Sequence, residues 1–388
     1  MLRLLIISDF TESFPNKVLE GIVDYSRRQE QWVICRMPPA YKNMIGIGGV
    51  VDWAKDWGAD AVIGQFEETD EVGLFAESGI VAVAQDFKKR FKTIPNLTGD
   101  YLGTGRMAAR FFLDRGFRHF GFFGLNRVCW SDERREGFFQ EIESAGYGDA
   151  FHSYCQQDID QLWYYGKEQL DAWLHSLPKP IGIMACDDNQ GINLIEACHA
   201  LGIKIPSEIS VIGVDNDELL CSLASTSLSS IQVDIKEGGY RLAEMIEQRV
   251  AHPSLPVRDI VLHPVKIIGR MSTAAYATDD VQIRKAILFI HSNFLKKISV
   301  GDVISEVALS RRLLERRFKD VTGQTLYQYI TDLKIKHFAE LLRTTDEPVI
   351  NLAMSLGETD TKSISRRFRQ FYGCSPGEWR SKIKTETI

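Results

Sequence analysis

The chain has 388 residues, of which 44% are hydrophobic, 25% charged and 10% aromatic. This length predicts two or three domains with substantial cores, and this composition excludes disordered, collagen-like and coiled-coil proteins. No stretch approaches the roughly 20 apolar residues of a membrane span. Met1–Phe10 lacks the long apolar region and cleavage site of a signal peptide. We therefore expect a cytoplasmic protein with no membrane partner.

The cysteines and histidines do not indicate a metal centre. Seven cysteines are scattered along the chain without a CxxC pair, which fits reduced thiols better than disulfides or a zinc site. The eight histidines form no cluster with the spacing of metal ligands. We expect neither a metal nor a cofactor.

The net charge of −6 is distributed unevenly. Residues Val281–Ile388 contain 19 basic and 12 acidic residues, a net charge of +7, whereas the rest of the chain carries −13. A basic module joined to a larger acidic region favours nucleic-acid binding at that end of the chain.

From Met1 to about Arg270, short apolar runs alternate with amphipathic stretches. The runs lack polar–apolar alternation, which indicates strands buried on both faces. The expected strands are Leu2–Ser8, Trp32–Cys35, Ala59–Ile63, Gly79–Ala84, Phe120–Gly124, Ile181–Cys186 and Ser210–Val214. The expected helices are Pro15–Arg28, Gly103–Arg115, Ser131–Ala145 and Gln190–Leu201. This alternation predicts a parallel, doubly wound α/β fold.

Polar residues follow several of these strands. Because ligands bind at the carboxyl ends of strands in such folds, these residues are candidates for a pocket. They are Asp9, Asp86, Asp187, Asp188, Asp215 and Asn216. Any one of them could instead cap the next helix, but their recurrence at the same structural position favours a binding site.

From Val281 onward the pattern is helical. Apolar residues recur at positions i, i+3, i+4 and i+7 in three segments, beginning at Val300, Leu326 and Val349. We expect an all-helical domain over 281–388, joined by a linker over 274–280 to a first domain that covers 1–273.

A motif in the helical region repeats after fifty positions. Its first copy is Leu314, Arg316, Arg317, Phe318 and Gly323, and its second is Ile364, Arg366, Arg367, Phe368 and Gly373. Each copy follows a short amphipathic helix, Val300–Leu309 or Val349–Leu356. This order is typical of a helix-turn-helix unit, whose second helix enters the major groove of DNA.

The polar face of each basic helix supplies the candidate DNA contacts. Arg and Lys can bond guanine, Glu can accept from cytosine, and arginines can also contact phosphates. The candidates are Arg311, Arg312, Glu315 and Arg316 in the first copy, and Thr361, Lys362, Ser365 and Arg366 in the second.

The helical region resembles the AraC-type DNA-binding domain. The resemblance covers 281–388 and is carried by SRRLLERRFKDVTGQTLYQYITDLKIKHFAELL, VINLAMSLG and ISRRFRQFYGCSPGEW. It implies two helix-turn-helix units joined by a long helix, about Thr325–Thr344. Glu358 stands where the family usually has an aromatic residue, Phe338 where it usually has alanine, and Lys334 where it usually has arginine.

The first region resembles the lactose-repressor-type and periplasmic sugar-binding fold, without that family's DNA-binding headpiece. The resemblance is carried by GTGRMAARFFLDRGFRHF, RREGF, IPSEISVIGVDND and IGRMST. It implies two lobes around a cleft, with crossovers near Arg115, Val233 and His252–Pro256. It also implies that Arg134 and Asp215 bond sugar hydroxyls.

Trp130, four residues before Arg134, offers a ring on which the apolar face of a sugar can stack. The alternative for this residue is a core or interface aromatic.

The two resemblances together imply a sugar-responsive, sequence-specific transcriptional regulator, an activator of monosaccharide catabolic genes. Closure of the cleft would control DNA binding. The expected partners are double-stranded operator DNA, a monosaccharide such as xylose, glucose or ribose, a second copy of the chain, and RNA polymerase.

Two alternatives stay open. The first domain could be a ligand-free dimerisation or partner module, or the chain could be a sugar-acting enzyme. Since the sequence contains no P-loop, HExxH or GxSxG motif, we expect that it is not an enzyme.

Overall fold

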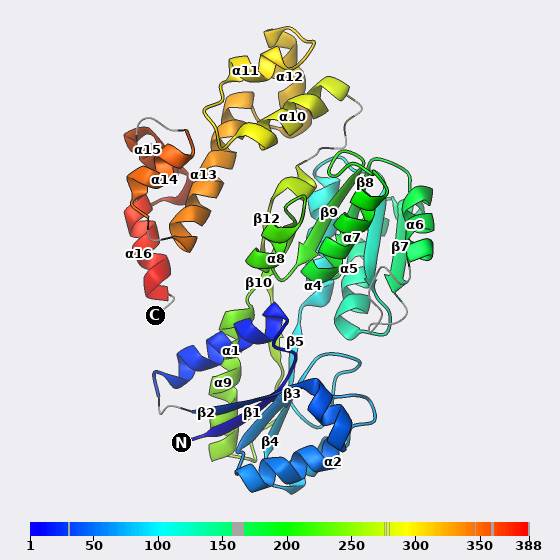
Figure 1. The fold of residues 1–388 in the computed structure, drawn as a ribbon, viewed down its shortest axis with the longest axis vertical. Helices are drawn as coiled ribbons and strands as arrows, with labels where there is room; N and C mark the ends of the chain where they lie inside the picture. Colours follow the sequence, from blue (N-terminus) through cyan, green and yellow to red (C-terminus); the bar gives the residue numbers. More distant parts are fainter. Residues whose placement is uncertain are drawn as a thin grey trace. The chain divides into compact units, whose positions relative to one another are not determined.

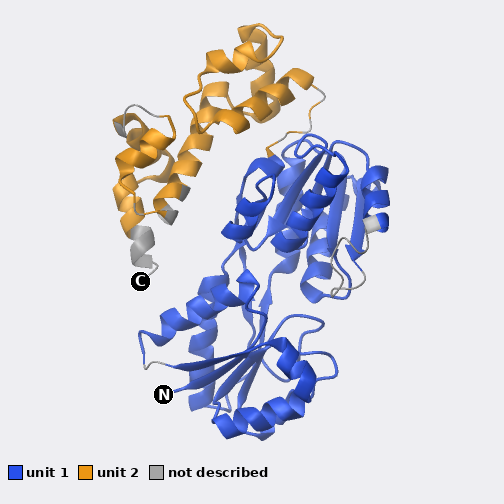
Figure 2. Cartoon of the chain, viewed as in Figure 1, with its two compact units in different colours: residues 1–273 blue, residues 274–388 orange. Residues whose placement is uncertain are grey.

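The chain folds into two compact units, Met1–Thr273 and Ala274–Ile388 (Figure 2). The computed structural model describes residues 1–29, 32–156, 167–274, 276, 278, 280–345, 347–357 and 361–386. None of the helices in these ranges is both long and apolar enough to cross a membrane.

The first unit contains two six-stranded sheets, one in each of two lobes (Figure 1). The first sheet is parallel throughout, in the order β11(Ile260–Leu262), β5(Asn96–Gly99), β4(Val81–Gln85), β3(Ala61–Gly64), β1(Arg3–Ile7) and β2(Val33–Met37). The second has the order β12(Pro264–Ile268), β10(Ser229–Val233), β9(Ile209–Val214), β8(Ile181–Ala185), β6(Phe120–Leu125) and β7(Phe151–Gln156), and β12 alone pairs antiparallel in it. Every residue of β6, β8 and β9 is buried, as their unbroken apolar runs predict. The predicted two-lobed α/β architecture is confirmed.

Helices cover both faces of the sheets. In the first unit they are α1(Ser13–Ser26), α2(Pro39–Trp57), α3(Gly73–Glu77), α4(Tyr101–Leu113), α5(Cys129–Ser144), α6(Lys167–Ser176), α7(Asp188–Ala200), α8(Glu218–Leu223) and α9(Ile235–Ala251). In the first lobe, α1 and α9 pack together on one face of the sheet and α2 lies on the other (Figure 1). The sequence pattern missed α2 because three glycines interrupt its apolar periodicity and Gly46 kinks it with a φ of 68°.

The chain crosses between the lobes three times. The crossovers lie between β5 and α4, between β10 and α9, and between β11 and β12. The prediction near Val233 is confirmed, whereas those at Arg115 and His252–Pro256 are wrong. The reason is that β5 and β11 have only four and three residues, too few for a recognisable apolar run.

The second unit is helical throughout its described residues. Its helices are α10(Val281–Asn293), α11(Val300–Ser305), α12(Arg311–Thr322), α13(Leu326–Thr344), α14(Val349–Ser355), α15(Thr361–Tyr372) and α16(Pro376–Glu386). Two small cores form, one around Leu314 and Phe318 and the other around Ile364 and Phe368. The long α13 contributes to both cores, because its first half carries Leu326 and Ile330 while its second half carries Ile335 and Phe338. The predicted pair of helix-turn-helix units is confirmed.

The structure describes two of the three residues at which this unit departs from the AraC-type pattern. Phe338 is fully buried and packs edge-to-face on Phe368, with ring centroids 5.7 Å apart, so the larger side chain fills the second core. Lys334 is also buried, and its Nζ donates to the Leu356 carbonyl oxygen at 2.9 Å. Glu358 lies outside the described residues.

Candidate functional site

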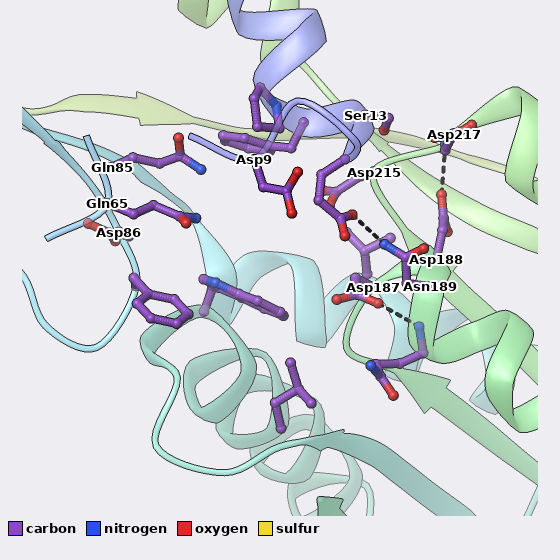
Figure 3. A pocket seen from close by; sticks show the side chains of 18 of the residues that line it. Asp9, Ser13, Gln65, Gln85, Asp86, Asp187, Asp188, Asn189, Asp215 and Asp217 are labelled. Atoms are coloured by element: carbon purple, nitrogen blue, oxygen red, sulfur yellow. Dashed lines mark hydrogen bonds between the residues drawn. The ribbon is translucent and has the colours of Figure 1, made fainter. Parts of the chain in front are cut away.

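A cavity of about 420 Å³ lies between the two lobes of the first unit. This volume is in the range of pockets that hold small molecules. Residues of both lobes line it: Gln65, Gln85 and Asp86 lie on one side, and Asp187, Asp188, Asn189, Asp215 and Asp217 lie on the other (Figure 3). Among the described residues that line it, seven carry a carboxylate and Arg134 alone is a permanent cation. The cavity is therefore strongly acidic.

Seven of the eight predicted ligand residues line this cavity. They are Asp9, Asp86, Trp130, Arg134, Asp187, Asp188 and Asp215. Asn216 is not among the lining residues, because its side chain is buried and its Oδ1 accepts a hydrogen bond from Arg270 at 2.8 Å.

Sequence reasoning missed several lining residues, Glu12, Gln65, Gln85, Tyr101 and Asn189 among them. Gln65 directly follows β3 and Gln85 ends β4. The rule that selected the aspartates at strand ends would have found both glutamines. Glu12 and Tyr101 precede or begin helices, and no pattern in the sequence marks them.

Close packing of α4 on α5 places Arg134. A Cβ atom at Gly105 would lie 2.2 Å from the Arg134 carbonyl oxygen, and one at Gly137 would lie 2.2 Å from the Leu102 carbonyl oxygen. Only glycine at these two positions allows the helix backbones to approach this closely. The approach fixes the turn of α5 that carries the arginine into the cavity.

The Arg134 guanidinium is buried and held from several sides. It is 4% exposed, its Nη1 donates to the Cys186 carbonyl oxygen at 2.5 Å, and its Nη2 pairs with Asp215 Oδ1 at 3.4 Å. The rings of Tyr101 and Trp130 each lie 5.3 Å from its central carbon. Its Nε has no hydrogen-bond partner among the described residues. A buried donor of this kind requires an acceptor, and a ligand oxygen can supply one.

Asp86 presents the complementary group. Its Oδ2 accepts from Thr98 Oγ1 at 2.6 Å and from Arg90 Nε at 2.9 Å, and its Oδ1 has no partner within the described part of the chain. Burial raises the pKa of this carboxyl, and the hydrogen bonds from Thr98 and Arg90 oppose that shift. A hydroxyl both donates and accepts, so it matches the unpaired acceptor on Asp86 and the unpaired donor on Arg134.

Asp187 and Asp188 combine a capping and a lining role. Asp187 caps α7 by accepting from the Gln190 amide at 2.7 Å, and Asp188 Oδ2 accepts from the Asp217 amide at 2.7 Å (Figure 3). Burial, reinforced by nearby Asp215, raises the pKa of Asp187 to about 7 and that of Asp188 to about 8. Near neutral pH these two groups are therefore partly protonated, and in that form they donate as well as accept hydrogen bonds.

Polar contacts join the lobes around the cavity. Lys17 Nζ, from α1, donates to the carbonyl oxygens of Asp215 and Asn216 at 2.7 and 2.9 Å. Glu12 Oε2 accepts from Asn189 Nδ2 at 2.5 Å. The second-lobe Cys129 and Glu133 bond to the first-lobe Phe87 carbonyl oxygen and to Arg90, each at 2.8 Å. These contacts tie the cavity-facing surfaces of the two lobes together.

The basic helices α12 and α15 present the candidate DNA contacts on their outer faces. Arg311, Arg312, Arg316, Lys362 and Arg366 are exposed. Glu315 and Ser365 are half-buried, and the side chain of Thr361 lies outside those described. Arg311 Nε pairs with Glu315 Oε1 at 3.0 Å, which holds both side chains on the same outer face.

The second arginine of each repeated pair has a structural contact. Arg317 Nη1 pairs with Asp280 at 3.0 Å, next to the start of α10, and Arg367 lies over the Tyr327 ring of α13 at 5.3 Å. Arg316 and Arg366, one position earlier, are exposed. The second arginine of each pair therefore contacts a neighbouring element, although the Arg317 side chain stays 45% exposed.

An acidic, hydroxyl-matching cavity between two α/β lobes, followed by two helix-turn-helix units, defines a ligand-responsive transcriptional regulator. Comparison with known families agrees with this class. The periplasmic binding protein-like domain matches residues 109–273, and the helix-turn-helix domain matches residues 304–382.

Curated proteins that match almost the whole chain indicate which kind of transcriptional regulator it is similar to. The xylose operon regulatory protein of Haemophilus influenzae is 28% identical over 386 residues, which cover 97% of this chain and 98% of that protein. The protein of the same name from Escherichia coli K12 is 25% identical over 97% of this chain and 96% of its own length. The solved structure of a xylose-binding transcription activator shares the fold, with a TM-score of 0.67 and 24% identity over 98% of this chain and 97% of that one.

The order of the two domains, with the sugar-binding type first and the AraC type second, predicts likeness to the xylose operon regulator, and these relatives confirm it. They are named as regulators and not as enzymes, in agreement with the prediction that this chain is not an enzyme.

Proposed function

We propose that this chain activates transcription in response to a neutral monosaccharide, xylose or a closely related pentose, bound between its lobes. The observation that carries the proposal is the ion pair between buried Arg134 and half-buried Asp215, beside Trp130 in an acidic cavity. The indole face can stack on the apolar face of the sugar, and the charged groups can form strong bonds with its hydroxyls. The names of the whole-chain relatives support xylose as the first candidate.

The charge of the cavity restricts the effector to unphosphorylated, uncharged sugars. Seven carboxyl groups line the cavity, of which Asp187 and Asp188 are partly protonated near neutral pH, and the lining arginine already pairs with Asp215. A phosphate or carboxylate on the ligand would meet like charges in a partly dehydrated space, which is costly. The hydroxyls of a neutral sugar can instead donate to the lining carboxyl groups and accept from the arginine.

The sugar would act by joining the lobes. A ligand with contacts on both lobes binds the closed arrangement more tightly than an open one, so it shifts the population toward closure. Two such chains would associate as a homodimer in the cytoplasm and bind double-stranded operator DNA. Each chain would place α12 and α15 in major-groove segments about 34 Å apart and would contact RNA polymerase at the promoter.

Calorimetric titration of the full-length protein tests this function. Xylose, ribose, glucose and ribose 5-phosphate are the probes, followed by operator titrations with and without the sugar that binds. We expect a neutral pentose to bind, the phosphate ester not to bind, and the bound sugar to change operator affinity. Failure of every neutral sugar in the panel would instead support the ligand-free partner module, and turnover of a sugar would support an enzyme.

A further inference from the structure

The turn that presents Asp215 to the cavity has an unusual backbone. Asp215 and Asn216 have φ angles of 92° and 48°, the left-handed region, although neither is glycine. Asp and Asn tolerate this region better than other residues, but two in succession persist only where the surroundings hold them. The turn follows β9, and its first side chain forms the ion pair with Arg134.

Three sets of hydrogen bonds hold the turn. Lys17 reaches both carbonyl oxygens from the first lobe. The Asp215 amide donates to the Ile231 carbonyl oxygen at 2.9 Å, and the Asn216 amide donates to Ser230 Oγ at 3.0 Å, both on β10. Finally, Arg270 Nη2 donates to Asn216 Oδ1 at 2.8 Å. Because its Oδ1 is bonded to Arg270, the Asn216 side chain stabilises the turn and does not line the cavity.

Arg270 begins the segment that ends the first unit. Its Nη1 donates to the Leu228 carbonyl oxygen at 2.8 Å, and its amide donates to Ser229 Oγ at 2.6 Å. Ser272 Oγ, two residues on, accepts from the Ser229 amide at 2.8 Å and donates to the Val211 carbonyl oxygen at 2.6 Å. The first unit ends at Thr273, after which the chain continues into the helical unit.

The Asp215–Asn216 turn and residues 270–273, the exit segment, thus share one hydrogen-bond network, in which the linking Arg270 is half-buried. Ser229 and Ser272 are fully buried, and Thr273 is 4% exposed, with its Oγ1 2.7 Å from Ser229 Oγ. Loss of one hydrogen bond in this network leaves a polar group unpaired among buried residues, which is costly. The network therefore favours the arrangement in which all of its hydrogen bonds are present together.

We propose that Arg270 is a positioning residue that holds the Asp215–Asn216 turn in its ligand-binding conformation and connects it to the exit segment. A sugar bound to Asp215 stabilises the turn, and through the Arg270–Asn216 bond it stabilises one arrangement of residues 270–273. Since coupling of binding equilibria is reciprocal, operator DNA raises or lowers sugar affinity through the same bond by the same factor. The effect on DNA rests on the proposed function, whereas the positioning role does not.

Four full-length variants test this proposal. Arg270→Ala removes the donor, and Asn216→Gly removes the acceptor while suiting the positive φ. The double variant measures their coupling. Arg110→Ala is the matched control, because Arg110 lies in the same lobe but makes an exposed ion pair with Glu141 at 2.8 Å.

The first readout needs no ligand. Amide hydrogen exchange of residues 215–217 should become about tenfold faster in Arg270→Ala and in Asn216→Gly, with no further increase in the double variant. It should stay at the wild-type rate in Arg110→Ala. Unchanged exchange in Arg270→Ala would overturn the positioning role, whatever the effector proves to be.

The second readout is the ratio of operator affinities with and without xylose. Arg270→Ala should bring a wild-type ratio of fivefold or more close to one, and Arg110→Ala should keep it. A full xylose response in Arg270→Ala would overturn the connection to the exit segment. If the wild-type protein itself does not respond to xylose, the proposed effector fails, and the exchange rates still decide the role of Arg270.

Discussion

At the scale of single residues, the cavity is defined by charged groups whose hydrogen bonds are incomplete. Arg134 and Asp86 are both buried, and each keeps one polar atom without a partner among the described residues. Their other bonds, to Cys186, Asp215, Thr98 and Arg90, hold those atoms in place. This prior positioning lowers the cost of binding, because the side chains lose little freedom when a ligand arrives.

Arg134→Ala should abolish most of the sugar affinity. The change removes a buried charge-assisted donor and leaves the half-buried Asp215 without its cation, so we expect an affinity loss of about 100-fold or more, measured by calorimetry with xylose. Arg135→Ala is the control: Arg135 pairs with Asp132 at 3.2 Å and its side chain is 37% exposed, so its affinity should match that of the wild type. Equal losses in the two variants would contradict the assignment of Arg134 to the site.

Asp187 should make the stability of the first unit depend on pH. Its pKa is about 7 in the folded protein, against an ordinary value of 3.8, because burial disfavours its charged form. Between about pH 4 and pH 7 the unfolded chain loses this proton while the folded chain keeps it, so the free energy of unfolding falls as pH rises.

Asp187→Asn removes this titration but keeps an oxygen that can cap α7. We expect the variant to gain about 1–2 kcal/mol over the wild type at pH 8 and little at pH 4, measured by urea unfolding at both values. The raised pKa of Asp188 also makes the free energy of unfolding fall as pH rises, but Asp188 is present in both the wild type and the variant. A difference between the proteins that does not change with pH would show that Asp187 is charged in the folded state.

At the scale of elements, the helices of the second unit divide the arginines into two roles. The outer faces of α12 and α15 carry exposed Arg312 and Lys362, while Arg317 and Arg367 contact residues of other helices. Periodicity predicts the outward face of each helix, because the buried Leu314, Phe318, Ile364 and Phe368 fix the side that faces the core. The contacts of Arg317 and Arg367 come from the tertiary structure.

Arg312→Ala and Lys362→Ala should each weaken operator binding by about 10- to 100-fold, the loss expected for one side chain that reads a base. Fluorescence anisotropy measures the affinity for the operator and for an unrelated duplex. Loss of a base contact weakens binding to the operator only, whereas loss of a charge weakens binding to both duplexes. Arg317→Ala, which removes the same charge from the Asp280 contact, should mainly lower thermal stability. Retained sequence preference in both Arg312→Ala and Lys362→Ala would reject these helices as the readers of the operator.

At the scale of the whole molecule, the cavity depends on the two lobes of the first unit and on the contacts that cross between them. Lys17 is a prominent crossing contact, since one ammonium group bonds two carbonyl oxygens of the other lobe. It does not line the cavity. We therefore expect Lys17 to influence sugar binding through the position of the lobes and of the Asp215–Asn216 turn.

Lys17→Met should lower xylose affinity by about 5- to 10-fold without removing any group that lines the cavity, because the joined arrangement becomes less populated. Calorimetry measures the affinity, and small-angle scattering of the sugar-free protein should show a more open first unit. Lys236→Met is the control, since Lys236 pairs with Asp24 at 2.7 Å within one lobe. Equal affinities in wild type and Lys17→Met would contradict a role for Lys17 in closure.

The sequence by itself determined the architecture and most of the cavity. Buried parallel strands have unbroken apolar runs, and their ends face a common edge, so Asp86, Asp187 and Asp215 could be selected from local patterns alone. The repeated Arg-Arg-Phe motif in the same way placed the two basic helices α12 and α15, because a helix with one apolar face has one possible orientation on its core.

Only the tertiary structure decided which residues meet. Lys17 and Asp215 are separated by 198 positions, and Asn216 and Arg270 by 54. Whether Asn216 faces a ligand or another side chain depends on the left-handed turn, and no local pattern predicts that turn. Local patterns report which face of an element is apolar, whereas crossover positions and hydrogen bonds between distant segments arise only once those faces have packed.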